Sequence, residues 1–167
     1  MIALQLTSLK IFMYKLLAQD AFDEFLLEEA TIRTANTFTI DGHMNKDFFL
    51  PEEHDSEALK YDMRPWSEIK GLCFDLIKGK HTPLSFKFIL HLKPEACARL
   101  LQDSQLDETL PQLKSLAVNI RYDGNIATLT TGVAYSSFIL NKEADNLWDK
   151  EIQHFLSSGE IPFEIMQ

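Results

Sequence analysis

Hydrophobic and polar residues alternate along several stretches of the chain, and a period of two residues is typical of half-buried β-strands. Residues 84–92 show it best, because apolar side chains recur at every second position of this stretch. Weaker alternation predicts four further strands: 2–6, 118–122, 125–135 and 161–165. The last of these would be a short edge strand. The strand at 125–135 either ends at Tyr135 or extends to Leu140.

The same period of two runs from Phe25 to Gly42, where β-branched residues are dense, as strands favour. Apolar residues at 30, 32, 38 and 40 share one parity, and charged or Thr residues take most of the opposite positions. Ala35 and Asn36 either form a turn that splits this stretch into a hairpin or lie within one long strand.

Between the strands the apolar spacing changes to three and four residues, which is typical of one buried helix face. Residues 9–17 form the first such stretch, with Thr7 or Ser8 as its N-cap. Pro65 suits the first turn of a second helix, which ends before Gly79. Its predicted inward residues are Ile69, Leu72, Cys73, Leu76 and Ile77.

Two further helices follow later in the chain. Pro94 opens a short one, in which residues 97, 100 and 101 face inward. The last helix begins after Asn141, which can cap it, and ends at Gly159.

Two connections carry informative residues. Asp123-Gly124 is a strong hairpin signal and predicts a type I′ turn, with positive φ at both residues. Residues 51–64 are highly charged without a clear period and predict a surface excursion. Tyr61, Met63 and Trp66 in and beside it either form a partner interface or fold back over the core.

This element order predicts an α+β fold, in which an antiparallel sheet carries helices on one side. We expect one domain over residues 1–167. A β-α-β-β order occurs over 1–50 and again over 84–140, which suggests a duplicated unit. The charged excursion with its helix, 51–83, and the C-terminal helix, 141–158, complete the chain.

The repeated β-α-β-β order resembles that of the sliding clamps that encircle DNA. This resemblance implies a nucleic-acid face on the helices, for which the chain offers Lys10, Lys15 and Arg99. Three cations would contact only a few phosphates of a nucleic acid. The resemblance to sliding clamps is therefore interpreted as a similarity of fold and not as evidence that the protein encircles DNA.

Over nearly its full length the chain also resembles an uncharacterised family of Gram-positive anaerobic bacteria. The stretch from Phe25 to Ile32, the run from Asn36 to Gly42 and the segment from Asn45 to Phe48 carry this similarity. The resemblance implies no activity, since none is attached to that family.

Composition narrows the function classes further. A hydrophobic fraction of 46% and a charged fraction of 25% exclude disordered and collagen-like chains. The net charge of −9 disfavours a basic nucleic-acid binder. No stretch is long and apolar enough to span a membrane, and the N-terminus lacks the features of a signal peptide, so we expect a cytoplasmic protein.

No catalytic motif, phosphate-binding glycine loop or zinc-ligand spacing occurs. The best polar cluster comprises Asp41, His43, Asn45 and Asp47, with His54 and Asp55 nearby in sequence, and its oxygen ligands would suit Mg²⁺ or Ca²⁺. An ordinary polar turn that begins at Asp41-Gly42 is the favoured explanation of the cluster, because its spacing matches no known metal-binding loop. Cys73 and Cys97 lie at apolar helix positions and are expected to be inert core thiols.

The sequence therefore favours a non-catalytic binding or interaction module that needs no cofactor and uses a protein partner or a second copy. The alternatives are a clamp-like nucleic-acid-associated protein and, with less support, a metal-dependent hydrolase built on the cluster at 41–55.

Overall fold

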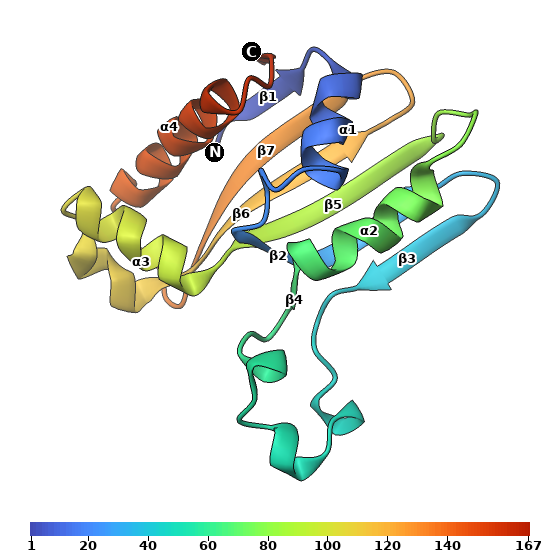
Figure 1. Cartoon of the computed structure of the whole chain (residues 1–167). Coiled ribbons are helices and arrows are strands. Elements are labelled where there is room, and N and C mark those ends of the chain that lie inside the picture. The colour runs from blue at the N-terminus through green and yellow to red at the C-terminus, as the bar shows by residue number, and fades with distance from the viewer.

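A twisted antiparallel sheet runs through the molecule, and the helices pack on one of its faces (Figure 1). The computed structural model describes the backbone of residues 1–167 and every side chain except those of Asp107 and Leu110. The strands are β1 (Ala3–Leu6), β2 (Phe25–Arg33), β3 (Thr37–Asp41), β4 (Arg64–Pro65), β5 (Ser85–Leu92), β6 (Leu113–Tyr122), β7 (Ala127–Tyr135) and β8 (Phe163–Ile165). The helices are α1 (Leu9–Leu17), α2 (Trp66–Ile77), α3 (Pro94–Asp103) and α4 (Glu143–Ser158). These elements confirm the predicted α+β class.

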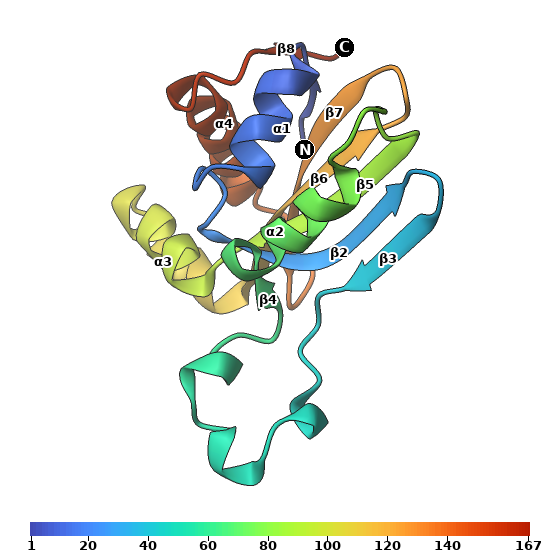
Figure 2. The same cartoon turned by 45° about the vertical axis from the view of Figure 1, so that its right-hand side comes forward.

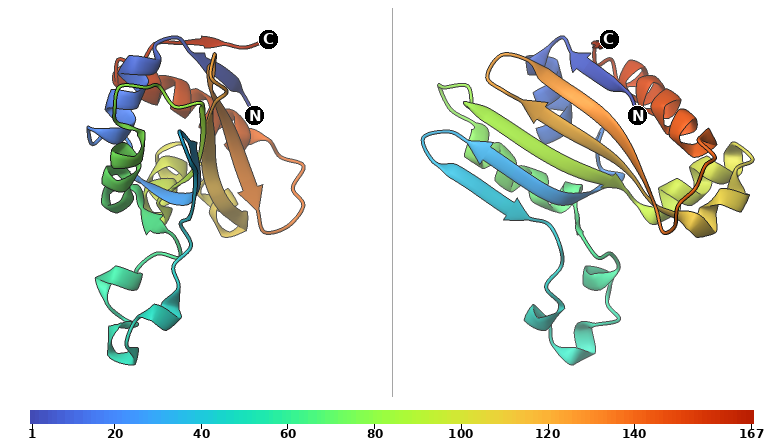
Figure 3. Two further views of the ribbon diagram at one scale, coloured as in Figure 1. Left: turned by 90° about the vertical axis from the view of Figure 1, so that its right-hand side faces the viewer. Right: turned by 180° about the vertical axis from the view of Figure 1, so that it is seen from behind.

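The sheet has the strand order β3-β2-β5-β6-β7-β1-β8, and the short β4 pairs with β2 beside this path. Helix α2 packs on β2, α3 on β6 and α4 on β7, while α1 lies against α2. The opposite face of the sheet carries no helix, as the view from behind shows (Figure 3). Within the described chain no helix is long and apolar enough to cross a bilayer.

The stretch from Phe25 to Gly42 is a hairpin, which settles the alternative that the sequence left open. Strand β2 ends at Arg33 and β3 begins at Thr37, and the backbone amide of Thr34 donates to the Asn36 carbonyl at 2.8 Å. Ala30 lies opposite Ile40 and Ile32 opposite Phe38 in the resulting pair, so the alternating apolar residues of both strands share the face of the hairpin that meets the core.

The first two helices meet through one buried side chain. Ser8 caps α1 by accepting from the Ile11 amide, as predicted. Trp66 is fully buried, and its Nε1–H donates to the Leu16 carbonyl at 2.9 Å. That carbonyl belongs to the last turn of α1, which has no partner within its own helix. Trp66 therefore folds back over the core, and the interface alternative is wrong for this residue.

Two predictions about α2 need correction. The helix begins at Trp66, so Pro65 precedes its first turn. Leu72 was expected to face inward but is 49% exposed. Helix α2 lies at one side of the helical layer (Figure 1), and of its residues only Trp66 and Cys73 are buried, so the face that meets the core is narrower than the apolar spacing predicts. Gly79 follows the helix with a φ of +142°, a conformation that glycine adopts easily.

The hairpin between β6 and β7 forms where Asp123-Gly124 predicts it, but not with a type I′ turn. Only Gly124 has a positive φ, at +96°. The Asp123 carboxylate instead accepts from the backbone amides of Asn125 and Ile126, which makes a longer loop. Strand β7 ends at Tyr135 and does not reach Leu140.

The C-terminal elements follow the sequence prediction except at the start of α4, where Lys142 and not Asn141 takes the N-cap position. The Asn141 side chain accepts from the Glu143 amide at 2.8 Å where α4 begins. Strand β8 forms the edge of the sheet beside β1. Between the helices and the sheet lies an aromatic group that joins the two ends of the chain: Phe12, Phe22, Phe25, Trp148 and Phe155.

The two β-α-β-β blocks take different places in the sheet. Strand β5 pairs with β6 of its own block, whereas β1 pairs with β7 of the other block and is separated from β2. The duplication and the domain boundaries stay predictions, since element order alone supports them.

Candidate functional site

Residues 43–63, named the arm here, leave the body of the molecule between β3 and β4 (Figures 1 and 2). They contain three short 3₁₀ turns, at Lys46–Phe48, Pro51–Glu53 and Glu57–Leu59. None of the side chains in these turns is buried. The predicted surface excursion is therefore a protrusion that begins eight residues earlier than its charged stretch.

Backbone contacts join the two ends of the arm at its base. His43 forms a β-bridge with Met63, and the Met44 amide donates to the Asp62 carbonyl at 2.8 Å. One residue further toward the body, the Arg64 amide donates to the Gly42 carbonyl at 2.8 Å. The arm thus leaves and re-enters the body at one point.

Gly42 fixes the direction in which the chain leaves the sheet. Its amide donates to the Glu28 carbonyl at 2.8 Å, beside an irregularity between Leu27 and Glu29 in the pairing of β2 with β5. A Cβ atom on Gly42 would lie 1.9 Å from the Leu27 carbonyl oxygen. Only glycine permits so close an approach of the two backbones.

A side-chain cluster also ties the arm to the start of α3. The Tyr61 hydroxyl donates a hydrogen bond to the Glu95 carboxylate. The ammonium groups of Lys60 and Lys93 lie 5.4 and 5.7 Å from the centre of the Tyr61 ring, within the range of cation–π attraction. We call these four residues the latch.

The latch shifts the pKa values of its acidic members in opposite directions. Burial, followed by the hydrogen bond to Glu95, raises the pKa of Tyr61 to about 12. The hydrogen bond from Tyr61 holds the pKa of Glu95 below its ordinary value. Both shifts favour the pair of a neutral phenol and an ionised carboxylate at neutral pH.

The tip of the arm presents apolar side chains to solvent. Phe48 is 85% exposed and Leu50 is 58% exposed. The Phe48 ring meets the ring of Phe49 edge to face, with centroids 5.4 Å apart. The Leu50 amide donates to the Glu53 carboxylate at 2.7 Å, which fixes the turn that follows.

Acidic residues flank this apolar tip. The arm contains six carboxylates and only two lysines. Asp47 precedes the tip and Asp62 lies at the base, whereas four carboxylates follow the tip: Glu52, Glu53, Asp55 and Glu57. The tip is therefore apolar, and the segment that follows it is strongly negative.

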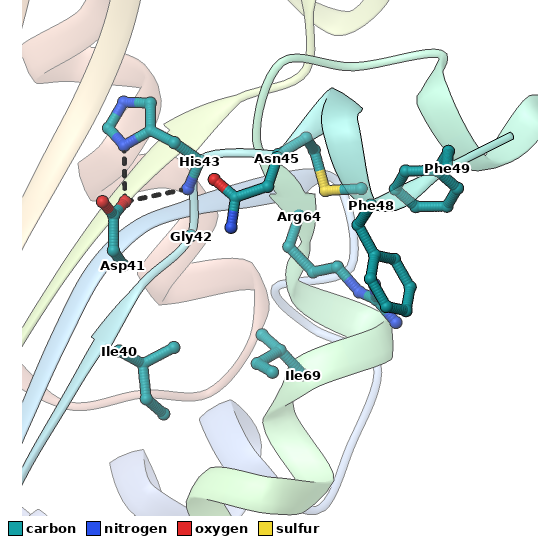
Figure 4. A pocket seen from close by; sticks show the side chains of 10 residues that line it. Ile40, Asp41, Gly42, His43, Asn45, Phe48, Phe49, Arg64 and Ile69 are labelled. Carbon is teal, nitrogen blue, oxygen red and sulfur yellow. Dashed lines mark hydrogen bonds and ion pairs between the residues drawn. The ribbon is translucent and has the colours of Figure 1, made fainter. Parts of the chain in front are cut away.

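A pocket of about 250 Å³ lies where the arm meets the sheet (Figure 4). Ile40, Phe49 and Ile69 give it apolar walls, and Asp41, His43 and Arg64 stand at its rim. This pocket continues the apolar surface of the tip toward the body.

Asp41 and His43 form one polar pair at that rim (Figure 4). The Asp41 carboxylate accepts from the His43 amide at 3.0 Å and lies 2.7 Å from His43 Nδ1. The backbone hydrogen bond, followed by the side-chain one, lowers the pKa of Asp41. This arrangement is that of a polar turn after a strand, in which the carboxylate orders the next residues.

The structure brings together only part of the predicted metal cluster. Asp41 and His43 meet, whereas Asp47 lies in the first turn of the arm and His54 follows the second, and neither lines the pocket. Among the described residues there is no group of three His, Cys, Asp or Glu side chains placed to hold a metal ion. Metal binding here stays a prediction.

The predicted nucleic-acid face is divided between two helices. Lys10 and Lys15 lie on α1, whereas Arg99 lies on α3, at another end of the helical layer (Figures 1 and 2). Arg99 is 3.3 Å from the Glu24 carboxylate and forms an ion pair with it. The three cations therefore do not form one continuous track.

Cys73 and Cys97 are both buried. Burial raises the pKa of Cys73 to about 12 and that of Cys97 to about 11. Thiols with such pKa values hold little thiolate at neutral pH and are poor nucleophiles.

Sequence reasoning did not identify the latch or the pocket. Tyr61 and Glu95 are 34 residues apart, and nothing in either local pattern pairs them. The exposed Phe48 and Leu50 were visible as an apolar group just before a charged stretch, which was the available signal for the tip.

Comparisons with known proteins identify a family but no activity. A search of the curated proteins found no match, and neither did a search of the solved structures. A family described as a family of unknown function (DUF5721) matches residues 15–164. The expected resemblance to a family without an assigned activity is confirmed, in that the matching family has no known function. Because the match covers most of its length, the chain belongs to the DUF5721 family of unknown function.

Proposed function

We propose that this protein is a cytoplasmic, non-catalytic protein-interaction module and that the arm is its recognition element. The proposal rests on the exposure of apolar side chains at the tip of the arm. Phe48 and Leu50 are held in solvent on a protrusion whose base and latch fix its position.

The energetics of burial support this role. Covering a large apolar side chain contributes about 2 kcal/mol, so Phe48 and Leu50 together can supply much of the free energy of a transient complex. Aromatic side chains are enriched at the centres of interfaces for this reason. Because the latch and the backbone contacts position the arm before binding, little ordering entropy opposes association.

The chemistry of the arm indicates the kind of partner. A protein with an apolar cleft would receive Phe48 and Leu50, and basic residues beside the cleft would face the carboxylates after the tip. Such pairing of opposite charges speeds association and makes it sensitive to salt. The pocket at the base would receive an apolar side chain from the same partner.

Photo-crosslinking from the tip tests the proposal. A benzoylphenylalanine at position 48 should capture one protein from cells that make this chain. The same group at position 138 is the control, because Phe138 is 89% exposed but lies far along the chain, between β7 and α4. The captured protein is then purified and its affinity for the intact chain is measured.

The proposal is supported if the double variant Phe48→Asp with Leu50→Asp weakens this affinity by about a hundredfold or more, as the loss of two buried apolar contacts predicts. Phe138→Asp should leave the affinity unchanged. Capture of a second copy through position 48, weakened by the same variants, would also support it. The absence of any complex that depends on Phe48 would contradict it.

No observation on the described residues favours the clamp-like nucleic-acid role or the metal-dependent hydrolase. Both stay untested predictions of the sequence.

A further inference from the structure

A second surface, away from the arm, gathers cationic side chains around an open cavity. The cavity has a volume of about 540 Å³ and lies between the start of α1 and the segment that follows α2. Three lysines supply its positive charges, Lys10, Lys78 and Lys80, and His81 lies beside them. The chain as a whole carries a net charge of −9, so this concentration of cations departs from the general surface.

These cations are only partly neutralised by neighbouring carboxylates. Lys78 forms an ion pair with Asp75 at 3.0 Å. Lys10 and Lys80 take part in none of the ion pairs found among the described side chains. Of the side chains that the structure describes, those that line the cavity include no acidic one. An anion placed there would meet two uncompensated positive charges, those of Lys10 and Lys80.

The start of α1 adds to the positive potential. The first turn of this helix contains no acidic residue, and Lys10 lies within it. The N-terminal end of a helix carries a partial positive charge, which adds to that of the lysines. Gly79, with its φ of +142°, shapes the loop that brings the stretch from Lys78 to His81 alongside α1.

The remaining walls of the cavity are apolar. Leu9 and Met13 come from α1, Ile77 from the end of α2 and Phe86 from β5. A ligand that fills this space therefore needs an apolar or ring-containing body beside its anionic group. The volume is in the range of about 300–1,000 Å³ that small-molecule sites occupy.

A nucleic acid fits this surface less well than a small ligand does. Affinity for a nucleic acid comes largely from several phosphate contacts along its backbone. Here the cations surround one cavity, and Arg99 lies elsewhere on α3 in an ion pair. The site can neutralise one or two phosphates.

We propose that this cavity binds a small phosphorylated molecule with a ring-containing body, of the nucleoside monophosphate class. The phosphate lies among Lys10, Lys78 and Lys80, and the body rests on Leu9 and Met13. This site is separate from the arm and does not depend on its role.

Titration of the intact chain with three probes tests the proposal: adenosine monophosphate, adenosine and inorganic phosphate. Binding is followed by calorimetry and by backbone amide NMR shifts at low and at moderate salt. Adenosine monophosphate should bind saturably, shift amides of residues 9–13 and 77–83, and bind at least about fivefold more tightly than either fragment, because it uses both parts of the site.

Lys10→Gln and Lys80→Gln should each lower the affinity for adenosine monophosphate about fivefold, as the loss of one charged hydrogen bond at an exposed site predicts. Lys114→Gln is the matched control on an exposed lysine of β6 and should have no effect. Met13→Gln should lower the affinity for adenosine monophosphate and leave the affinity for inorganic phosphate unchanged.

Three results would overturn the proposal. The first is the absence of saturable binding, and the second is equal weakening by all three lysine variants, which would show unspecific attraction. The third is a dimer that the Lys10 and Lys80 variants dissolve and that adenosine monophosphate leaves intact, because a second copy would then occupy the cavity.

Discussion

Tyr61 links the arm to the body through a single side chain. Its hydroxyl donates to Glu95, and two lysines stand over its ring. Without this contact the arm would be held at its base alone, by backbone hydrogen bonds and by the pair of Asp41 and His43. The position of the tip relative to the body therefore depends in part on the contact between Tyr61 and Glu95.

The latch predicts a loss of stability at alkaline pH. The pKa of Tyr61 is raised from 10.0 to about 12, so the folded state favours the neutral phenol. This contribution is fully present below pH 10 and is lost as the pH rises toward 12. The free energy of urea unfolding of the intact chain should therefore fall relative to that of Tyr61→Phe over this interval.

Glu95→Gln serves as the control for that measurement, because it removes the carboxylate that accepts the hydrogen bond and should shrink the pH-dependent difference. Identical pH dependence of the intact chain and Tyr61→Phe would show that the latch does not form in solution.

The two cysteines illustrate a different single-residue effect, that of burial. Burial raises the pKa of Cys73 to about 12 and of Cys97 to about 11. Neither thiol should react with an aromatic disulfide reagent at neutral pH in the native state, and both should react in denaturant. Rapid reaction of either native thiol would contradict this placement.

At the scale of elements, the exit of the chain from β3 depends on one glycine. A Cβ on Gly42 would overlap the Leu27 carbonyl, so Gly42→Ala must separate β3 from β2 or move the arm. We expect a loss of about 3 kcal/mol or more in the free energy of unfolding, measured in urea.

Gly71 provides the matched control, because it lies within α2 and a Cβ there would meet open space. Gly71→Ala should stabilise the protein by up to about 1 kcal/mol, the difference in helix propensity. A Gly42→Ala variant as stable as the parent would contradict the close approach of the two backbones.

Local patterns predicted most of the elements because they depend on neighbours in sequence. The alternation over 84–92 and the helix spacing over 9–17 report which side of each element is buried. The cap at Ser8 depends on the next few residues alone. Such features need no knowledge of the rest of the fold.

The incorrect predictions concern residues whose environment is set by parts of the chain that are distant in sequence or by side-chain hydrogen bonds. Leu72 has the correct helical spacing, but the margin of the helical layer leaves it exposed. Trp66 follows a charged stretch that looks like surface, yet it is fully buried and donates to Leu16, fifty residues away in sequence. At Asp123, side-chain hydrogen bonds to the next amides select a loop other than the one that the dipeptide predicts.

At the scale of the whole molecule, the sheet order and the candidate site were beyond the sequence pattern. Strand β1 lies between β7 and β8, and no local signal specifies these partners. The latch joins Tyr61 to Glu95 through folding, and the basic cavity joins Lys10 to Lys80. Both candidate surfaces result from long-range packing.

The arm and the basic cavity divide the surface of the protein by charge. The arm is apolar at its tip and acidic behind it, whereas the cavity is basic in an otherwise acidic chain. The helix-free face of the sheet lies behind both helices that form the cavity (Figure 3). Separate surfaces with different chemistry suit a module that joins one macromolecular partner and one small ligand.

The affinity of the intact chain for the protein that is captured at position 48 tests the central claim most directly. The double variant Phe48→Asp with Leu50→Asp should weaken this affinity by about a hundredfold or more. Phe138→Asp should leave the affinity unchanged, and both variants should unfold like the parent. Equal affinities for the parent and the Phe48/Leu50 double variant would contradict a recognition role for the arm.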